Sequence, residues 1–382
     1  MSNKKLTIVH VEDNFNPTAG YQINELLIQN QYFKDNVILI STFDMKPFHK
    51  KYNAEADQLF EKNNNVKIIR KRYCLKISSR YLYWNLFRSI EKLSPDIVYL
   101  HGVGDFKDLI LWRKKRKYII VRDSHMSWVA SKNKFAKLFY TVFKKLFSPN
   151  INKKNKYETL FALGVEEKEY LNALGVSNNK IRMLPHGYNK NTMFFSENQR
   201  SIMRHELGIS SEKIVISYIG KFNFAKKPDI IFDIVEKLDE ATKSKIILNF
   251  VGPKDFNYMK FFNQKHNSFS SVKVLIQDAS PFSELYKHYS MSDICIFPKE
   301  TTLSSIHAQV CGCEVIMEKH NSNRERVVNN ENLFPIDNIE AASKILKNVI
   351  NSRAFDNRER YLTSLEYREY SNQVKEIRSL VK

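Results

Sequence analysis

Short apolar runs alternate with helical stretches along most of this chain, and this alternation constrains the fold more than any other feature. Residues 6–11 have the pattern of a buried strand, and a loop to Gly20 and a helical stretch follow it. Strands separated by helices predict a parallel sheet with helices on both faces. Further strands are predicted at residues 37–40, 66–69, 97–100, 118–121 and 160–163, and a helix at residues 81–93.

The same pattern starts again in the second half of the chain. Strands are predicted at residues 214–219, 246–251, 272–276, 294–297 and 315–317, and a helix at residues 229–238. With 382 residues the chain is also too long for one ordinary core. The sequence therefore predicts an α/β protein with two doubly wound domains that face a central cleft.

The polar stretch at residues 189–206 lacks a helical or strand period, and we place the domain boundary there. The predicted domains are an N-terminal, acceptor-side domain at residues 1–190 and a C-terminal, nucleotide-sugar domain at residues 191–360. A last helix is predicted at residues 361–382, and we expect it to pack back on the N-terminal domain.

The composition excludes some classes of protein and favours an anionic partner. Sixty-one Lys and Arg residues face forty-one Asp and Glu residues, which gives a net charge of +20. Such an excess favours nucleic acid, anionic lipid or a phosphorylated substrate as a partner. The start of the chain lacks a secretory pattern, and no stretch is apolar enough to span a bilayer. The four cysteines lack the spacing of a zinc site, so we expect reduced thiols and a cytoplasmic protein.

In the first half, polar residues that suit chemistry follow two of the predicted strands. Gly20 ends the loop after the first strand, where a glycine lets backbone amides approach an anion or simply permits a turn. His125 follows a later strand, next to Asp123 and Arg122, and His101 holds a similar place one strand earlier. We favour His125 as the functional histidine because of these two neighbours, although one of the histidines could simply cap a helix.

In the second half, a glycine turn with lysines follows the first strand. Gly220 and Lys221 come directly after that strand, and Lys226 precedes the next helix. A glycine and two cations in this arrangement suit a diphosphate leaving group. In a chain so rich in lysine, a solvated basic loop explains the same residues about equally well.

The segment from residue 298 to residue 316 reads as a strand end, a polar loop, a short helix of small residues and another strand. Ser304 lies near the start of the helix and His307 lies within it. Small residues at the start of a helix let a ligand approach closely, and hydroxyl and imidazole groups can bond to its oxygens. His307 taken alone is better explained as a partly buried histidine.

Taken together, these segments resemble the retaining glycosyltransferases of family 4, which have the GT-B fold. Leu184-Pro185-His186-Gly187-Tyr188-Asn189 resembles the family's interdomain Pro-Asn-Gly-Val-Asp sequence, and Gly220-Lys221-Phe222 with Lys226 resembles its Gly-Arg-Leu…Lys element. Ala308-Gln309-Val310-Cys311-Gly312 fits the family's Ala-x-x-Cys-Gly segment. The resemblance covers nearly the whole chain, in the expected order.

The resemblance also shows where this chain departs from the family. Two glutamates with seven residues between them usually precede the Ala-x-x-Cys-Gly segment. Here Lys299 stands at the position of the first glutamate, Glu300 follows one residue late, and His307 replaces the second glutamate, which binds ribose. Lys221 replaces an arginine, which keeps the charge and loses the bidentate fork.

What the resemblance implies is sugar transfer from a nucleotide diphosphate sugar, such as a UDP-sugar, with retention and without an obligatory metal or cofactor. The acceptor would be a glycan or glycolipid of a capsule, lipopolysaccharide or other surface polysaccharide pathway. His125 would approach the donor sugar and phosphate, and Lys221 and Lys226 would stabilise the departing diphosphate. The donor contacts would include Gly20, Gly220, Lys299, Glu300, Ser304 and His307.

A basic segment at residues 131–156 contains eight lysines and no acidic residue. Its apolar residues, Phe135, Leu138, Phe139, Val142, Phe143, Leu146 and Phe147, share one face of a predicted helix. That face suits either the headgroup layer of an anionic membrane or the sheet of the first domain. We slightly favour packing on the sheet for the aromatic residues.

Three other functions remain to be distinguished from sugar transfer. A sugar-nucleotide epimerase or phosphorylase could have the same architecture, since fold alone does not fix chemistry. The missing glutamates are also compatible with an inactive paralogue. Specific nucleic-acid binding is not expected, because no helix-turn-helix, zinc-finger or RNA-binding signature accompanies the charge.

Overall fold

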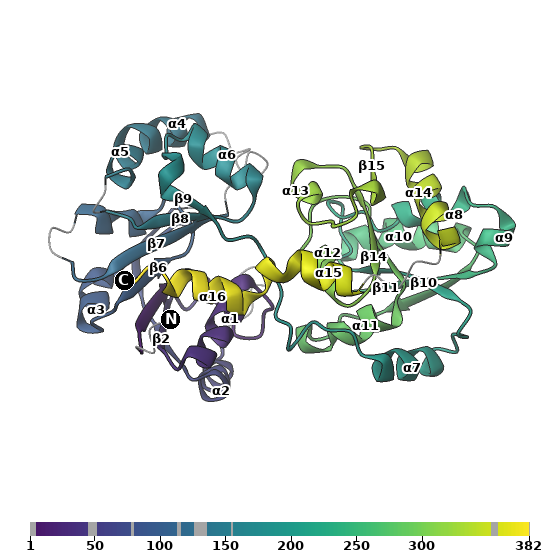
Figure 1. Cartoon of the computed structure of the whole chain (residues 1–382), viewed down its shortest axis with the longest axis horizontal. Coiled ribbons are helices and arrows are strands. Elements are labelled where there is room, and N and C mark those ends of the chain that lie inside the picture. Colours follow the sequence, from purple (N-terminus) through teal and green to yellow (C-terminus); the bar gives the residue numbers. More distant parts are fainter. Residues whose placement is uncertain are drawn as a thin grey trace. The chain divides into compact units, whose positions relative to one another are not determined.

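The computed structural model divides the chain into two compact α/β units (Figure 1). It describes residues 5–44, 52–77, 80–112, 116–125, 136–153, 156–352 and 358–381. The first unit comprises Met1–His186 and Tyr370–Lys382, and the second comprises Gly187–Glu369. Each unit has a parallel sheet with helices packed on it, so the predicted α/β class is confirmed.

The first unit contains a seven-stranded parallel sheet in the order β3-β2-β1-β6-β7-β8-β9. The order reverses between β1 and β6, which pair in parallel from Ile8↔Ile97 to Val11↔Leu100. The strands are nearly continuous apolar runs because both faces are covered. They are β1 (Thr7–Val11), β2 (Asn36–Ser41), β3 (Val66–Arg70), β6 (Ile97–Leu100), β7 (Ile119–Ser124), β8 (Thr159–Ala162) and β9 (Ile181–Met183).

The second unit contains a six-stranded parallel sheet in the order β12-β11-β10-β13-β14-β15. In chain order this is the 3-2-1-4-5-6 arrangement of a doubly wound sheet, with its reversal between β10 and β13. The strands are β10 (Ile214–Ile219), β11 (Ile246–Val251), β12 (Lys273–Gln277), β13 (Ile294–Phe297), β14 (Glu314–Glu318) and β15 (Leu333–Phe334).

Short helices connect the strands of both sheets. Those of the first unit are α1 (Gln22–Gln29), η1 (Asn30–Phe33), α2 (Ala54–Asn64), α3 (Leu86–Lys92), η2 (Phe106–Trp112), α4 (Ala136–Val142), η3 (Phe143–Phe147), α5 (Ser148–Ile151), α6 (Val165–Ala173), η4 (Asn178–Lys180) and α16 (Tyr370–Arg378). Those of the second unit are α7 (Glu197–Glu206), α8 (Ile230–Glu236), α9 (Glu240–Lys243), α10 (Phe256–Ser268), η5 (Phe282–Glu284), α11 (Leu285–Met291), α12 (Ser304–Val310), α13 (Asn321–Arg324), η6 (Asn330–Asn332), α14 (Ile339–Ser352), α15 (Arg358–Leu365) and η7 (Glu366–Arg368).

The prediction of one helix over residues 81–93 is wrong in its first part. Strand β5 (Arg80–Tyr83) pairs in antiparallel fashion with β4 (Tyr73–Ile77), and helix α3 starts only at Leu86. Asn85 has a φ of 54° and separates the two elements. The alternating aromatic residues of β5 suit a half-buried strand, because Tyr81 and Tyr83 are buried while Leu82 between them is less so.

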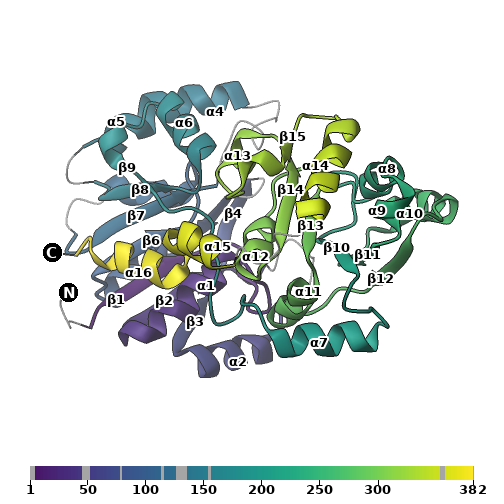
Figure 2. The same cartoon turned by 45° about the vertical axis from the view of Figure 1, so that its right-hand side comes forward.

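The polar stretch before the second sheet contains a helix that the sequence pattern does not reveal. Helix α7 begins after Ser196, whose hydroxyl accepts a hydrogen bond from the Gln199 amide at 3.3 Å. Arg204 on this helix is buried, and its guanidinium contacts the Asp293 carboxylate at 2.6 Å. This buried arginine interrupts the helical pattern of apolar residues in the sequence. It also helps to hold α7 beside α11 (Figure 2).

The C-terminal helix α16 belongs to the first unit, where it lies beside α1 (Figure 1). Its buried residues Tyr370, Val374 and Ile377 join a core cluster with residues of β1 and β6. The Gln373 amide donates to the Pro185 carbonyl at 2.6 Å, and Arg378 forms an ion pair with the buried Asp35.

The basic segment does not keep its seven apolar residues on one helical face. Phe135 lies outside the described residues, and a π-helical turn at Phe143–Phe147 shifts the register after α4. Phe143 is buried in the core, with Phe139 and Phe147 packed against it. Leu138, Val142 and Leu146 are exposed instead, so the predicted face is divided between the core and the surface.

The contact between Gly252 and Gly220 generates a prediction about stability. Gly252 has a φ of +146°, and a Cβ there would lie 1.9 Å from the Gly220 carbonyl oxygen. We expect Gly252→Ala to lower the free energy of unfolding by at least about 2 kcal/mol, since strain and a backbone clash add together. Urea unfolding of the whole chain measures the change.

Gly208→Ala is the matched control for this substitution. Gly208 also has a positive φ, of +61°, but nothing lies within 4 Å of its added Cβ. It should cost about 1 kcal/mol, from backbone strain alone. Equal losses for the two variants would contradict the steric argument.

Candidate active site

In both units some of the predicted site residues follow the strands at which the order of the sheet reverses, whereas His125 follows β7, the strand next to β6. In the first unit the chain leaves β1 at Glu12 and β6 at His101. In the second it leaves β10 at Gly220 and β13 at Pro298, just before Lys299 and Glu300. Doubly wound sheets bind ligands outside the carboxyl ends of their strands at such reversals. The two regions are described in turn.

A cavity of about 310 Å³ lies beside the reversal in the first unit. It draws residues from the loops after β1, β6, β7 and β9 and from the start of α1. Its lining is Glu12, Asn14, Asn16, Tyr21, Gln22, Ile23, His101, His125 and His186. A concave site with several imidazole, amide and carboxylate groups suits a polar ligand.

The loop between β1 and α1 is organised by Asn16 more than by Gly20. The Asn16 side-chain oxygen accepts hydrogen bonds from the Thr18 amide at 3.0 Å and the Thr18 hydroxyl at 2.9 Å. Asn24 of α1 donates to the Asn16 carbonyl at 2.8 Å. Gly20 directly precedes the cavity-lining residue Tyr21, so its contact with a ligand stays a prediction.

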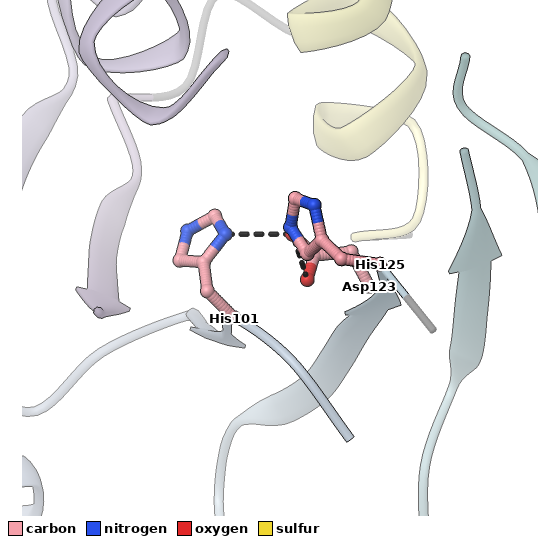
Figure 3. Close-up of side chains that lie close together, drawn as sticks. All are labelled: His101, Asp123 and His125. Atoms are coloured by element: carbon pink, nitrogen blue, oxygen red, sulfur yellow. Dashed lines mark hydrogen bonds and ion pairs between the residues drawn. The ribbon is translucent and has the colours of Figure 1, made fainter. Parts of the chain in front are cut away.

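His125 and His101 both contact the buried carboxylate of Asp123, which lies near the end of β7 (Figure 3). His101 Nδ1 lies 2.6 Å from Asp123 Oδ2, and His125 Nε2 lies 3.3 Å from Asp123 Oδ1. The Gly102 amide also donates to Asp123 Oδ1, at 2.7 Å. Asp123 is 1% exposed, whereas the side chain of His125 is 47% exposed, so His125 is the member that can reach a ligand.

The charge of Asp123 controls the protonation of His125. Burial alone would lower the pKa of His125, but the Asp123 carboxylate raises it above the usual value. Burial also acts to raise the pKa of Asp123, and the His101 and His125 rings hold it well below its usual range instead. His125 therefore keeps its proton to a higher pH than a free histidine, which suits an anionic ligand.

The three residues also have the composition of a metal site. One ligand atom from each of His101, Asp123 and His125 lies within 4.8 Å of the others. Two ligands of one tetrahedral zinc ion are about 3.3 Å apart, given metal–nitrogen bonds of about 2.0 Å. The 2.6 Å contact of His101 with Asp123 is shorter than that, so these two atoms share a proton in this arrangement.

Arg122 does not belong to the group formed by His101, Asp123 and His125. We preferred His125 partly because Arg122 is a near neighbour in sequence, and that part of the reason is wrong. Successive side chains of a strand point to opposite faces, so Arg122 and Asp123 diverge. The Arg122 guanidinium is fully buried and contacts Asp108 and Asp105, the latter at 3.0 Å. It also donates to the Gly102 carbonyl at 2.6 Å, and its role is to connect β7 with the loop after β6.

In the second unit, Gly220 permits close packing of the chain between β10 and the residues after β11. The Gly220 amide donates to the Val251 carbonyl at 2.9 Å, and the Tyr218 hydroxyl donates to the Lys221 carbonyl at 2.7 Å. A Cβ on Gly220 would lie 2.9 Å from that hydroxyl. These contacts fix the turn that carries Lys221, while a contact of Gly220 with a ligand stays a prediction.

Lys226 crosses from the loop after β10 to the loop after β13. Its ammonium donates to the Thr301 carbonyl at 2.8 Å and lies 3.3 Å from the Glu300 carboxylate. Burial lowers the pKa of Lys226, Glu300 partly offsets this, and the positive charges of Arg326 and Lys221 lower the pKa further. Lys226 thus lies beside the Glu300 carboxylate and within the electrostatic influence of Arg326 and Lys221, while the donor contacts predicted for Lys221, Lys226 and Glu300 stay predictions.

Glu300 adopts an unusual backbone conformation, with a φ of 31°. Its side chain is 54% exposed although it contacts Lys226. Residues other than glycine avoid positive φ, and such strain gathers at functional sites. Glu300, which stands one residue later than the family's first glutamate, lies beside Lys226. The negative charge of a ligand can take the place of its carboxylate there.

Lys299 and His307 have surroundings of a different kind. The Lys299 ammonium forms ion pairs with Glu318 and with Asp337, the latter at 2.6 Å. His307 is 3% exposed and packs edge-on against Phe282 at 5.6 Å. Burial lowers its pKa to about 4, so the ring is neutral at neutral pH.

The donor contacts predicted for Lys299, His307 and Ser304 stay predictions. Ser304 is half-buried at the first position of α12, where its amide donates to the Thr302 hydroxyl at 3.3 Å.

Sequence reasoning missed several residues of these two regions. Arg326 follows α13, and only its place in space relates it to Lys226. His10 lies inside a strand, and His186 comes after β9, where its ring lies 5.9 Å from that of His125. A polar residue within an otherwise apolar strand is the one signal that could have identified His10.

A family model matches part of the second unit. The model, of glycosyl transferases group 1, matches residues 199–364, which is most of that unit. A curated relative, D-inositol 3-phosphate glycosyltransferase of Geodermatophilus obscurus, is 20% identical over 161 residues. That match covers 40% of this chain and 35% of the relative, so the chain spans about a third of the length of this relative.

Solved structures show that the whole chain has the GT-B fold. A glycosyltransferase from Rickettsia africae has a TM-score of 0.72 at 15% identity, with 98% of both chains covered. Anabaena HepE in complex with UDP has a TM-score of 0.71 at 13% identity, covering 98% of this chain and 99% of that one. WaaG, a glycosyltransferase involved in lipopolysaccharide biosynthesis, has a TM-score of 0.64 at 11% identity and the same coverage. The predicted fold class is confirmed.

The contact of His125 with Asp123 predicts a measurable change of protonation. We expect Asp123→Asn to lower the pKa of His125, because the carboxylate that raises it is removed. The folded-state pKa is raised, so the stabilisation by this contact is complete below the ordinary value of 6.5 and is lost as pH rises through the folded value. Histidine ring NMR across a pH series measures both effects.

Glu167→Gln is the matched control, since Glu167 contributes less to the raised pKa of His125. Its effect should be clearly smaller than that of Asp123→Asn. An unchanged His125 titration in the folded Asp123→Asn variant would disprove the assignment.

Proposed function

We propose that this chain is a glycosyltransferase that moves a hexose from a nucleotide diphosphate donor to a surface-polysaccharide or lipid-linked glycan. Transfer is proposed to proceed with retention of configuration. The single observation that carries the proposal is Lys226, which bridges the loops after β10 and β13 at the reversal of the second sheet and lies within the electrostatic influence of Lys221 and Arg326. Three cations beside one exposed carboxylate are suited to a diphosphate.

Lys226 is a cation that is held in place before a ligand binds, which is the property that a diphosphate site requires. It is 18% exposed and held by a backbone carbonyl, while two other cations oppose its own charge. A pyrophosphate that displaces the Glu300 carboxylate would pair with Lys226 and would be favoured by the nearby positive charges of Lys221 and Arg326. The charge on a leaving diphosphate grows as the bond to the sugar breaks, so cations held in advance stabilise the transition state more than the ground state.

His125 is proposed to act on the same donor from the first unit. Its ring is protonated to a higher pH than a free histidine, so it can donate a hydrogen bond to the donor's sugar or phosphate oxygens. The diphosphate itself is proposed to accept the proton of the acceptor hydroxyl as the new bond forms. No metal or cofactor enters this sequence of steps.

The known properties of structural neighbours support a UDP-sugar as the donor. HepE has been solved with UDP and with UDP-glucose, and WaaG acts in lipopolysaccharide biosynthesis. A screen of nucleotide sugars for thermal stabilisation, followed by assay of diphosphate release, tests the donor. Release that requires an acceptor supports transfer over a sugar-nucleotide epimerase or phosphorylase, and tight binding without turnover supports an inactive paralogue.

An anionic membrane surface is proposed as a further partner. Leu138, Val142 and Leu146 are spaced four residues apart and are 64%, 37% and 56% exposed. Lys137, Lys144 and Lys145 are exposed beside them. Apolar residues that enter the headgroup layer and lysines that meet anionic lipid together favour peripheral binding. Among the described residues no helix is long and apolar enough to cross a bilayer.

Replacement of Lys226 tests the diphosphate site. We expect Lys226→Ala to lower kcat by about 100-fold or more with the fold intact, because a preorganised cation is lost from the leaving group. Acceptor-dependent diphosphate release measures the rate. Lys227→Ala is the control, since Lys227 is the exposed neighbour in the same loop, and it should keep near-normal turnover. Near-normal turnover of Lys226→Ala would contradict the assignment.

Replacement of two exposed leucines tests the membrane surface. We expect the double variant Leu138→Ser, Leu146→Ser to lose most of its binding to vesicles that contain phosphatidylglycerol, and the remainder to vanish at high salt. Co-sedimentation measures binding. Leu362→Ser, at an exposed leucine of the second unit, serves as the control. Absence of wild-type binding at every salt concentration would refute this partner.

A further inference from the structure

Four side chains form a continuous hydrogen-bonded chain from the core of the first unit to its cavity. His10 lies within β1, His101 follows β6, and Asp123 and His125 come at and after the end of β7. These are three adjacent strands of the sheet. His10 Nδ1 lies 3.0 Å from His101 Nε2, and the chain continues through Asp123 to His125 by the contacts described above.

His10 is placed where it cannot touch a ligand. It is 2% exposed, and its ring stacks on those of Tyr99 and His101, each with a centroid distance of 5.3 Å. Burial and the neighbouring His101 hold its pKa well below the usual value, so the ring is neutral. A buried polar ring inside an apolar strand costs free energy unless it has a defined partner, and here the partner is His101.

The hydrogen bonds give this chain a direction. Asp123 is anionic and can only accept, so His101 Nδ1 carries the proton of the 2.6 Å contact. The contact between His10 Nδ1 and His101 Nε2 needs a proton on one of these two nitrogens, so the proton positions of the two rings depend on each other. His10 therefore helps to fix the orientation of the His101 ring, and His101 in turn holds the Asp123 carboxylate.

We propose that His10 and His101 are positioning residues that hold Asp123 as an anion directed at His125 and so keep the exposed imidazole protonated for an anionic ligand. This inference rests on the proposed function only for its effect on turnover. The charge relation among the four side chains stands apart from any reaction.

Other charged and titratable groups also face the chain. Glu12, from the loop after β1, and Glu167, from α6, both act to raise the pKa of His125, after Asp123. His186, after β9, lies beside the His125 ring, and Tyr99, from β6, lies against His10 and His101. None of these groups changes in the variants below, so a shift of His125 in those variants comes through His10 and His101.

The decisive experiment compares His10→Phe with His10→Asn in the full chain. Phenylalanine keeps a planar ring in the stack and removes the nitrogen that contacts His101 Nε2. The His101 ring then loses the partner that helps to fix its orientation, and it holds the Asp123 carboxylate less firmly toward His125. Ring NMR should therefore show the pKa of His125 lowered by about half a unit or more. Asparagine places a side-chain amide, which can donate or accept, near the position of Nδ1, so His10→Asn should keep the wild-type value.

A second pair of variants tests whether the effect of His10 on His125 passes through His101. His101→Asn keeps a donor toward Asp123 and disconnects His10, so adding His10→Phe to it should change the pKa of His125 no further. Should His10→Phe fail to fold, His101→Phe removes the donor to Asp123 directly and should give the same fall. An unchanged His125 titration in the folded His10→Phe or His101→Phe variant overturns the proposal.

The pH profile of transfer separates this inference from the proposed function. The alkaline limb of turnover should move to lower pH in His10→Phe by the same interval as the NMR value. A shift by NMR without a shift of the limb supports the chain of contacts and contradicts the role of His125 in transfer. If the wild-type protein shows no transfer activity, the proposed function fails, and the NMR comparison of the variants alone decides the present proposal.

Discussion

Parallel strands place all their carboxyl ends at one edge of a sheet, and the proposed function depends on where the strand order reverses along that edge. At a reversal the two neighbouring loops turn away from each other, which can leave room for a ligand. In the first unit a cavity lies there beside Glu12 and His101, and in the second unit Lys226 joins the loops that follow the two strands. Any other residue at Gly252 would clash with the backbone of Gly220. Gly252 therefore helps to keep the shape of the loop that carries Lys221 and Lys226.

The two regions use buried charge in opposite ways. In the first unit a buried carboxylate, Asp123, has two imidazole partners and keeps the exposed one protonated. In the second unit the cations are in excess, and Lys226 is held chiefly by a neutral carbonyl. Lys299 shows the contrast, since two carboxylates neutralise it on the neighbouring strand end. Lys226 has one exposed carboxylate partner where Lys299 has two, so it gains more from a phosphate.

The sheets and the position of the Gly220 to Lys226 segment could be predicted from the sequence, because both depend on local pattern. Apolar runs placed the strands, and the Gly220 to Lys226 segment follows β10 as expected. Helix α7 was missed because a buried arginine and a side-chain cap, not an apolar period, define it. Arg122 was misjudged because the pleat of a strand separates adjacent side chains. Arg326 and His10 are related to the site only through distant parts of the chain, which a single sequence cannot reveal.

The most direct test of the central claim is amine labelling of the folded protein, read by mass spectrometry, with and without a nucleoside diphosphate. If the cations of the second unit hold the diphosphate, Lys221 and Lys226 should be protected by UDP and much less by UMP. Lys299, which is already paired with carboxylates, should be labelled equally in both cases. Protection of lysines elsewhere, with Lys221 and Lys226 labelled at the same rate whether or not UDP is bound, would contradict the account.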